Sequence, residues 1–162
     1  MITTKPRLSI CIPTFNRADL LEVCLASVLP QVASFEHEIE CVISDNASPD
    51  HTAEVIARFS NEYVLRSFRN PSNIGIIANI TRCASELAEG EFVYLIGDDD
   101  VLTAGAVSRI MDALRSESAP DLIVLNVGYL PRDQRPSAIS ALGGVSAKCE
   151  RTLRKSDIDG QV

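Results

Sequence analysis

Residues 92–100 read Phe-Val-Tyr-Leu-Ile-Gly-Asp-Asp-Asp, so an unbroken apolar run passes directly into three carboxylates. The five consecutive apolar residues at 92–96 predict a strand that is buried on both faces, as the strands of a parallel sheet are. Ligands of parallel α/β sheets bind beyond the carboxyl ends of the strands. This stretch therefore predicts a parallel sheet with an acidic ligand site at one edge.

Outward from this stretch, the apolar pattern changes repeatedly between strand spacing and helix spacing. Strands are predicted at 8–13, 39–44 and 122–125, and a weaker strand at 64–68. Apolar residues recur at helical spacing after each of the first four strands. This alternation predicts an α/β fold with three layers, α/β/α, around a mainly parallel sheet.

Local signals predict where the helices begin and end. The expected boundaries are Asn16 and Pro30 for the first helix, Ser48 or Asp50 at the start of the second, Gly90 after the third, and Thr103 at the start of the fourth. Asn, Ser, Asp and Thr side chains accept hydrogen bonds from the first N–H groups of a helix, whereas Pro and Gly commonly follow its end. In the third helix, an apolar stripe from Ile76 to Leu87 is expected to face the core.

The character of the chain changes after residue 129. Prolines and glycines at Pro131, Pro136, Gly143 and Gly144 interrupt the pattern, and residues 151–162 are polar with charges of both signs. We therefore expect residues 1–130 to form the α/β domain. Residues 131–162 are expected to form an irregular tail without a strand or a long helix.

Composition and charge exclude several classes of protein. With 162 residues, of which 46% are hydrophobic, the chain is long and apolar enough to bury a core. Its net charge of −7 argues against a nucleic-acid partner, because phosphate binding needs a basic surface. The five cysteines form no CxxC pair and show no zinc-site spacing, so a reducing, cytoplasmic location is expected. The chain has no run of 18 apolar residues, so no transmembrane segment is expected.

Polar residues follow three of the predicted strands, so they are expected to meet at one edge of the sheet. The first strand ends at Pro13 and Thr14 and is followed by Asn16 and Arg17. Free N–H groups at the start of the next helix, with the cation of Arg17, would suit a phosphate. Alternatively, Asn16 only caps the helix and Arg17 is only solvated.

The triplet Asp98, Asp99 and Asp100 is the sharpest chemical feature of the sequence. Three adjacent carboxylates repel one another unless a cation offsets their charge. Oxygen ligands of this kind suit Mg²⁺ or Mn²⁺, which commonly bind together with substrate phosphates. The alternative is a solvated acidic loop.

Asp45 ends the second strand and is followed by Asn46. An acidic residue in this position of a nucleotide-binding α/β fold often accepts a hydrogen bond from the nucleoside. Asp followed by Asn also favours a turn, so a turn-forming role is the equal alternative.

Four motifs together resemble one known family. Residues 9–17, 43–50, 73–75 and 90–100 read Ser-Ile-Cys-Ile-Pro-Thr-Phe-Asn-Arg, Ile-Ser-Asp-Asn-Ala-Ser-Pro-Asp, Asn-Ile-Gly and Gly-Glu-Phe-Val-Tyr-Leu-Ile-Gly-Asp-Asp-Asp. In order and spacing, from residue 8 to about residue 125, they resemble the family 2 glycosyltransferases of the GT-A (nucleotide-diphospho-sugar transferase) fold. The second and fourth motifs are similar to those of abequosyltransferase-like enzymes of bacterial surface-polysaccharide assembly.

The resemblance implies an enzyme that transfers a sugar, with inversion, from a nucleotide-diphosphate donor to a hydroxyl acceptor. It favours a UDP-type donor, a glycan or lipid-linked acceptor, and Mn²⁺ or Mg²⁺ as the cofactor. The expected setting is the synthesis of bacterial surface polysaccharide or cell-envelope glycan. This places the protein in the cytoplasm, with peripheral contact at the inner face of the membrane.

The resemblance also implies roles for individual residues. Pro13, Thr14, Asn16, Arg17 and Asn79 would line the nucleotide site, Asp45 would contact the base, and Asp98, Asp99 and Asp100 would occupy the DxD position that meets ribose, metal and diphosphate. The chain departs from the family pattern in two places. It has Gly97 where the acidic motif often begins with Asp, and Ala78 where many members carry Arg before the Asn.

The acceptor-binding half and the catalytic base of such enzymes follow the DxD region. Residues 131–162 offer no base in a matching context, so we expect the base beyond residue 162 and regard the tail as the start of a truncated acceptor-binding region. Apolar surface left uncovered would favour a homo-oligomer. The alternatives are a nucleotide-sugar-binding fragment without activity, a metal-dependent nucleotidyltransferase, which would normally have a Gly-rich basic first loop, and a receiver-like domain, which needs an Asp after its third strand.

Overall fold

A computed structural model describes residues 5–35, 37–116, 122–124 and 151–153. The chain divides into two compact units, Met1–Leu102 and Thr103–Val162. The predicted domain boundary at residue 130 lies outside the described residues and stays a prediction.

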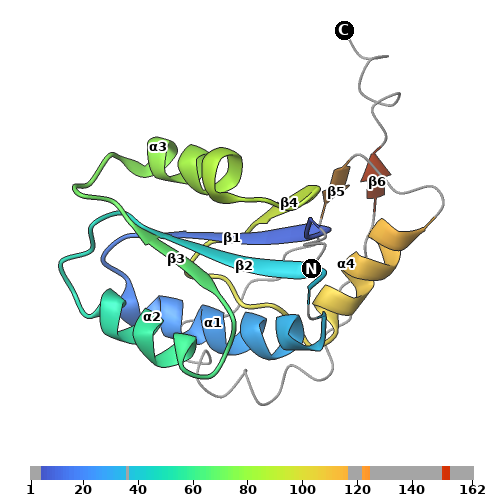
Figure 1. Ribbon diagram of the computed structural model, residues 1–162, viewed down its shortest axis with the longest axis horizontal. Coiled ribbons are helices and arrows are strands. Elements are labelled where there is room, and N and C mark those ends of the chain that lie inside the picture. The colour runs from blue at the N-terminus through green and yellow to red at the C-terminus, as the bar shows by residue number, and fades with distance from the viewer. Residues whose placement is uncertain (1–4, 36, 117–121, 125–150, 154–162) are drawn as a thin grey trace, which may run out of the picture. The chain divides into compact units, whose positions relative to one another are not determined.

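The first unit is built on a four-stranded parallel sheet (Figure 1). Its strands are β1 (Leu8–Thr14), β2 (Ile39–Asp45), β3 (Arg66–Arg69) and β4 (Phe92–Leu95). They lie in the order β3-β2-β1-β4, and every neighbouring pair is parallel. The predicted parallel sheet is therefore confirmed, with β1 and β2 at its centre.

Helices cover both faces of this sheet. In Figure 1, α1 (Ala18–Val32) and α2 (Thr52–Ser60) lie on one face, and α3 (Ile76–Thr81) lies on the other. A short 3-10 helix, η1 (Ala33–Phe35), follows α1, and a π-helical segment, η2 (Arg82–Leu87), continues α3. This arrangement confirms the predicted α/β/α layers.

The two central strands and α1 together supply more than half of the buried apolar residues in the described part of the chain. Leu8, Ile10 and Ile12 of β1 are at most 2% exposed, and the apolar residues of α1 that face the sheet are equally buried. Cys11, Cys24, Cys41 and Cys83 are free and buried. Burial raises the pKa of the Cys41 thiol to about 12, so this side chain is a small apolar core residue, as predicted.

Two helix ends differ from the prediction. Pro30 does not end α1, which continues to Val32. A proline in the last turn removes one hydrogen bond only, and the Gln31 side chain donates a bond of 2.8 Å to the Ser27 carbonyl nearby. The third helix ends at Leu87 rather than at Gly90, because Ala88 is extended.

The predicted apolar stripe of the third helix is buried only in its later part. Cys83 and Leu87 are buried, whereas Ile76 and Ile77 are 73% and 72% exposed. Asn79 contacts Ser44, next to the last residue of β2, so the first turn of α3 projects beyond the end of the sheet. The prediction was wrong for the first turn of α3, because the spacing of apolar residues does not reveal where the strand beneath the helix ends.

Segment Ala18–Phe35 comprises α1 and η1. By its length and composition alone, it could cross a membrane. In the structure, Leu21, Cys24, Leu25 and Val28 of this segment are fully buried. This burial favours its interpretation as a core helix.

The second unit contains α4 (Ala106–Arg115), β5 (Leu122–Val124) and β6 (Arg151–Leu153). Strand β5 was predicted to belong to the parallel sheet, but it pairs antiparallel with β6 in a separate two-stranded sheet. The prediction that the tail has no strand was also wrong, because three mostly polar residues give no apolar signal. Thr103 does not cap α4 with its side chain; the helix follows Gly105, whose φ is 73°.

Candidate functional site

The last residues of three strands form one row across the carboxyl edge of the sheet. Thr14 of β1 is the register partner of Asp45 in β2, and Asp45 is the partner of Arg69 in β3. Register partners on neighbouring strands direct their side chains to the same face. Polar residues at the strand ends therefore lie side by side at one edge, as predicted. The row also includes Arg69, which the sequence analysis did not single out.

Thr14 also connects this row to the acidic triplet. Its hydroxyl donates a hydrogen bond of 2.8 Å to Oδ2 of Asp98, and Arg17 donates to Oδ1 of Asp98 at 3.2 Å. Asp98 is only 5% exposed. Burial raises the pKa of Asp98 above its ordinary value, although Thr14 and Arg17 oppose the shift. Thr14, Arg17 and Asp98 thus form a polar cluster that joins β1, the start of α1 and the loop after β4.

Helix α1 holds the acidic loop at both of its ends. The Cys24 thiol lies 3.6 Å from the carbonyl oxygen of Gly97, and the Ser27 hydroxyl accepts a hydrogen bond of 3.1 Å from the Leu102 nitrogen. The Ile96 nitrogen donates to the Cys11 carbonyl at 3.0 Å. These three anchors fix residues 96–102 beside the end of β1.

The other two carboxylates of the triplet face outward. Asp99 and Asp100 are exposed, and Oδ2 of Asp99 lies 3.5 Å from Nη1 of Arg17. A Cβ at Gly97 would lie 2.9 Å from Oδ1 of Asp99 and 3.0 Å from Oδ2 of Asp100. The missing side chain of Gly97 therefore leaves a space that both carboxylates border, and the Gly97 nitrogen donates to Oδ2 of Asp100 at 3.2 Å.

Within the described residues, no group of three or more His, Cys, Asp or Glu side chains is arranged to hold a metal ion. The donors that are present still suit Mg²⁺ or Mn²⁺ in kind, because Asp99 and Asp100 offer two hard oxygen atoms beside Gly97. Such ions keep several water ligands and need only one or two carboxylates together with substrate phosphates. The site residues therefore fit a divalent cation that binds with a diphosphate.

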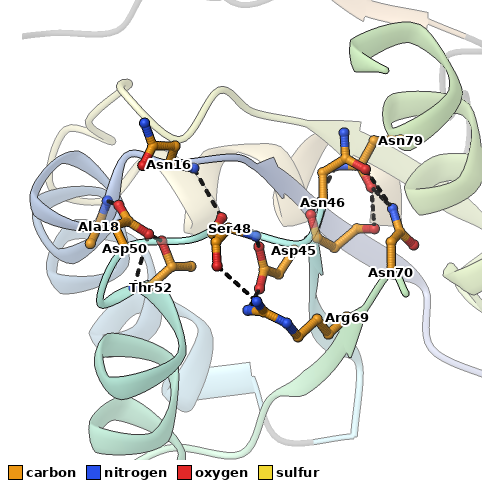
Figure 2. A network of polar contacts seen from close by, with 11 residues as sticks. Asn16, Ala18, Asp45, Asn46, Ser48, Asp50, Thr52, Arg69, Asn70 and Asn79 are labelled. Atoms are coloured by element: carbon orange, nitrogen blue, oxygen red, sulfur yellow. Dashed lines mark hydrogen bonds and ion pairs between the residues drawn. The ribbon is translucent and has the colours of Figure 1, made fainter. Parts of the chain in front are cut away.

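Asp45 uses both of its carboxylate oxygens within the protein (Figure 2). Oδ1 accepts a hydrogen bond of 2.9 Å from the Ser48 nitrogen, and Oδ2 forms an ion pair with Nη1 of Arg69. Nη2 of Arg69 donates to the Ser48 carbonyl at 2.7 Å. The turn-forming role of Asp45 is confirmed, and its contact with a base stays a prediction.

Asn16 does not cap α1 as predicted. Asn16 has a left-handed φ of 55°, and its nitrogen donates to the Ser48 hydroxyl at 2.9 Å. The Ala18 nitrogen instead donates to Oδ2 of Asp50 at 2.9 Å, while the nitrogens of Leu20 and Leu21 donate to the Arg17 carbonyl. The start of α1 therefore offers fewer free N–H groups to a phosphate than the sequence predicted.

Asn79 is 3% exposed and fully engaged within the protein. Its Oδ1 accepts from the Ser44 hydroxyl at 2.8 Å and from Asn70 at 2.9 Å, and its Nδ2 donates to the Ser44 carbonyl at 2.9 Å. Figure 2 shows this contact beside Asn46, which accepts a hydrogen bond from Asn70. The observed role of Asn79 is to attach α3 to β2, and its contact with a nucleotide stays a prediction.

The chain is similar in sequence to known proteins. A family model described as glycosyl transferase family 2 matches residues 9–138. Abequosyltransferase RfbV of Salmonella typhimurium is 37% identical over 113 residues, which cover 68% of this chain and 33% of that protein. The GalNAc(5)-diNAcBac-PP-undecaprenol beta-1,3-glucosyltransferase of Campylobacter jejuni is 33% identical over 116 residues, covering 65% and 34% of the two chains. The chain spans about a third of the length of these relatives.

Solved structures share the fold. The mannosyltransferase PcManGT from Pyrobaculum calidifontis, in complex with GDP-Man and Mn²⁺, superposes with a TM-score of 0.61 at 21% identity over 86% of this chain and 39% of its own. TarS 1-349 of S. aureus in complex with UDP-GlcNAc superposes with a TM-score of 0.55 at 21% identity over 67% of this chain and 31% of its own. These likenesses confirm the GT-A fold predicted from the sequence.

Proposed function

Because the chain belongs to glycosyl transferase family 2, we propose that it binds a nucleotide-diphosphate sugar and takes part in transferring the sugar to a hydroxyl acceptor with inversion. The observation that carries this proposal is the cluster of Thr14, Arg17 and Asp98 at the carboxyl edge of the sheet, inside the region that the family model matches. Ligands of parallel α/β folds bind at this edge.

The donor's diphosphate lies at the β1 and β4 end of the edge in this proposal. Arg17, whose side chain is half exposed, supplies a cation there. Asp99 and Asp100 hold Mn²⁺ or Mg²⁺, and the bound ion would supply positive charge to the departing diphosphate. Asp98 lies deeper and keeps Arg17 and the acidic loop in place through its two hydrogen bonds. None of these residues is assigned as the base that deprotonates the acceptor.

The remaining parts of the proposal concern the nucleoside, the acceptor and the location. The row from Thr14 to Arg69 extends away from the acidic loop, where the diphosphate is placed, so the nucleoside of a UDP-type donor would lie along this row. The residues that border it are Pro13, Thr14, Asn16 and Asp45. The acceptor is a glycan or a lipid-linked glycan, as the undecaprenol in the name of one relative suggests. Four buried free thiols suit the cytoplasm, where the protein would contact the inner face of the membrane.

Homo-oligomerisation is also part of the proposal. Ile76 and Ile77 of α3 and Val93 and Leu95 of β4 are exposed apolar side chains that a second copy could cover. Light scattering of the purified chain tests this point. A monomer at concentrations of tens of micromolar would contradict it.

Binding experiments test the donor site. Thermal unfolding should be measured with UDP, CDP, GDP and ADP, each with Mn²⁺ and with EDTA. A nucleotide at a hundredfold excess over its dissociation constant stabilises by about 2.7 kcal/mol, and we expect this effect to need Mn²⁺. The double variant Asp99→Asn/Asp100→Asn should lose the metal dependence, whereas Asp112→Asn in α4 is the control. Stabilisation by no nucleotide would contradict the function, and equal stabilisation with EDTA would contradict the metal role.

A further inference from the structure

The row at the carboxyl edge contains one cation whose role the proposed function leaves open. Arg69 is the last residue of β3, opposite Asp45 of β2 and on the face that also carries Thr14 of β1. Neighbouring strands are about 4.8 Å apart, so Arg69 lies about 10 Å from Thr14 along the edge. It is therefore at the opposite end of the row from Arg17 and the acidic loop.

The ion pair between Arg69 and Asp45 is asymmetric in exposure. The Asp45 side chain is 3% exposed, whereas the Arg69 side chain is 50% exposed. Asp45 directs one oxygen to the Ser48 nitrogen and the other to Arg69, so both oxygens already have donors. A ligand that approaches this end of the edge meets the guanidinium first.

Arg69 also retains hydrogen-bonding capacity. A guanidinium has five N–H donors. One contact goes to Asp45 and one to the Ser48 carbonyl, and together they hold the planar group at two points. The remaining N–H groups suit acceptor atoms, and the buried carboxylate fixes the direction in which they point.

We propose that Arg69 is the residue that meets the nucleobase of the donor, and that Asp45 is a positioning residue that acts through Arg69. This inference rests on the proposed function, because it concerns the nucleoside end of the same donor site. The guanidinium can only donate, and a carbonyl oxygen accepts from it more strongly than the ring nitrogens that are adenine's acceptors, so we expect it to favour bases that present a carbonyl oxygen. Uracil, cytosine and guanine have such an oxygen, whereas adenine has none.

The test measures the affinities of the wild-type chain and of Arg69→Met for UDP, CDP, GDP and ADP by calorimetry with Mn²⁺. We expect the wild type to prefer at least one carbonyl-bearing nucleotide over ADP. Arg69→Met should bind that nucleotide about tenfold more weakly and ADP unchanged, as expected for one lost hydrogen bond. Arg58→Met is the control, because Arg58 is a similarly exposed arginine that pairs with Glu22 on the helical layer.

The nucleotide set separates the possible roles of Arg69, because ribose and diphosphate are common to all four ligands. Equal weakening of all four by Arg69→Met would mean a phosphate contact or a general loss of structure, and would overturn the inference. A preference that disappears in Asp45→Asn but persists in Arg69→Met would overturn it in favour of a direct Asp45 contact. A wild type that prefers ADP, or an unchanged preference in both variants, would overturn it too.

Removing Arg69 alone leaves the buried Asp45 carboxylate unpaired, which can prevent folding. The double variant Asp45→Asn/Arg69→Met removes both charges and should show the same loss of preference. If the wild type binds no nucleotide, the proposed function fails together with this inference. If the wild type binds and the double variant keeps the preference, only the inference about Arg69 fails.

Discussion

The carboxylate of Asp50 accepts a hydrogen bond of 2.9 Å from the backbone nitrogen of Ala18, at a separation of 32 residues in the chain. Its other oxygen accepts from the hydroxyl of Thr52 at 2.6 Å and from the Thr52 nitrogen at 3.2 Å. Ala18 and Thr52 are the first residues of α1 and α2. One carboxylate therefore serves the starts of two helices, where negative charge is favourable.

Replacing Asp50 by Ala should lower the free energy of unfolding by about 1–2 kcal/mol, the usual effect of losing a helix cap. Urea denaturation measures this change. Asp112→Ala is the control, because Asp112 is exposed and lies in α4 away from its first turn. If the free energy of unfolding falls no further than in the control, the contact between Asp50 and Ala18 contributes nothing to stability.

The same contact predicts a pH dependence. Burial raises the pKa of Asp50, but the hydrogen bonds from Thr52 and Ala18 more than offset it, so the pKa is below its ordinary value. Ionised Asp50 thus stabilises the fold above the unfolded-state pKa of about 3.9, and this contribution is lost as the pH falls through the lower folded-state value. The difference between wild type and Asp50→Asn should be full at pH 7 and shrink below pH 4. A constant difference down to pH 2 would contradict this assignment.

Thr14→Val removes the hydroxyl that donates to Asp98 while keeping the shape of the side chain. At pH 7 we expect a loss of about 1.5–3 kcal/mol, because the hydrogen bond goes to a buried charged group. Burial already raises the pKa of Asp98, so the folded state binds this proton more tightly than the unfolded state. The contribution of Asp98 to stability therefore increases as the pH falls toward the unfolded-state pKa.

The loss in Thr14→Val should accordingly be smaller at pH 4 than at pH 7, since a protonated, neutral carboxyl accepts a weaker hydrogen bond than a carboxylate does. Denaturant midpoints at several pH values measure it, with Thr81→Val, an exposed position in α3, as the control. A loss that grows as the pH falls would show that Asp98 is not the affected group.

Gly90 lies between η2 and β4, and replacing it by Ala should destabilise the fold. A Cβ there would lie 2.6 Å from both the nitrogen and the hydroxyl oxygen of Ser9. Overpacking of this kind costs about 1–3 kcal/mol, and Ser9→Ala should not relieve it because the backbone atom remains.

Gly75→Ala provides the contrast. A Cβ at Gly75 would meet no atom within 4 Å, but the residue has a φ of +88°. The substitution should therefore cost about 1–2 kcal/mol through backbone strain alone. Thermal and urea unfolding measure both.

Asn79→Ala should reduce stability by about 2–3 kcal/mol, because it leaves the buried Ser44 hydroxyl and Asn70 amide short of a partner. Asn61→Ala, at the exposed end of α2, is the control. Where the Asn79→Ala chain remains folded, an affinity for UDP equal to that of the wild type would show that Asn79 only attaches α3 to β2. A large loss of affinity without a loss of stability would support the nucleotide contact predicted from the family resemblance.

Much of the fold could be predicted because its signals are local. Residues 92–96 are continuously apolar, and their prediction as a strand of the parallel sheet is confirmed by β4. The prediction that this strand is buried on both faces was wrong, because β4 is an edge strand whose Val93 and Leu95 side chains are 44% and 43% exposed. Polar residues directly after such strands share one edge by the geometry of parallel sheets, which is why the contact between Thr14 and the acidic loop could be expected. Helix ends were less predictable: Pro30 was accommodated inside α1, because one lost hydrogen bond is outweighed by packing of the whole helix.

The sequence by itself determined the parallel α/β layers, the sheet edge at which the polar strand ends gather, and the residue types available there, because apolar periodicity and strand-end polarity act over a few residues. Tertiary structure alone decided which partners these residues have. Arg69 reaches Asp45 because β3 happens to end in register with β2, Asp50 reaches Ala18 because the two helices begin side by side, and β5 pairs with β6 rather than with the main sheet. Each of these contacts joins segments 24 or more residues apart, and its energy depends on burial and distance, which no short stretch of sequence specifies.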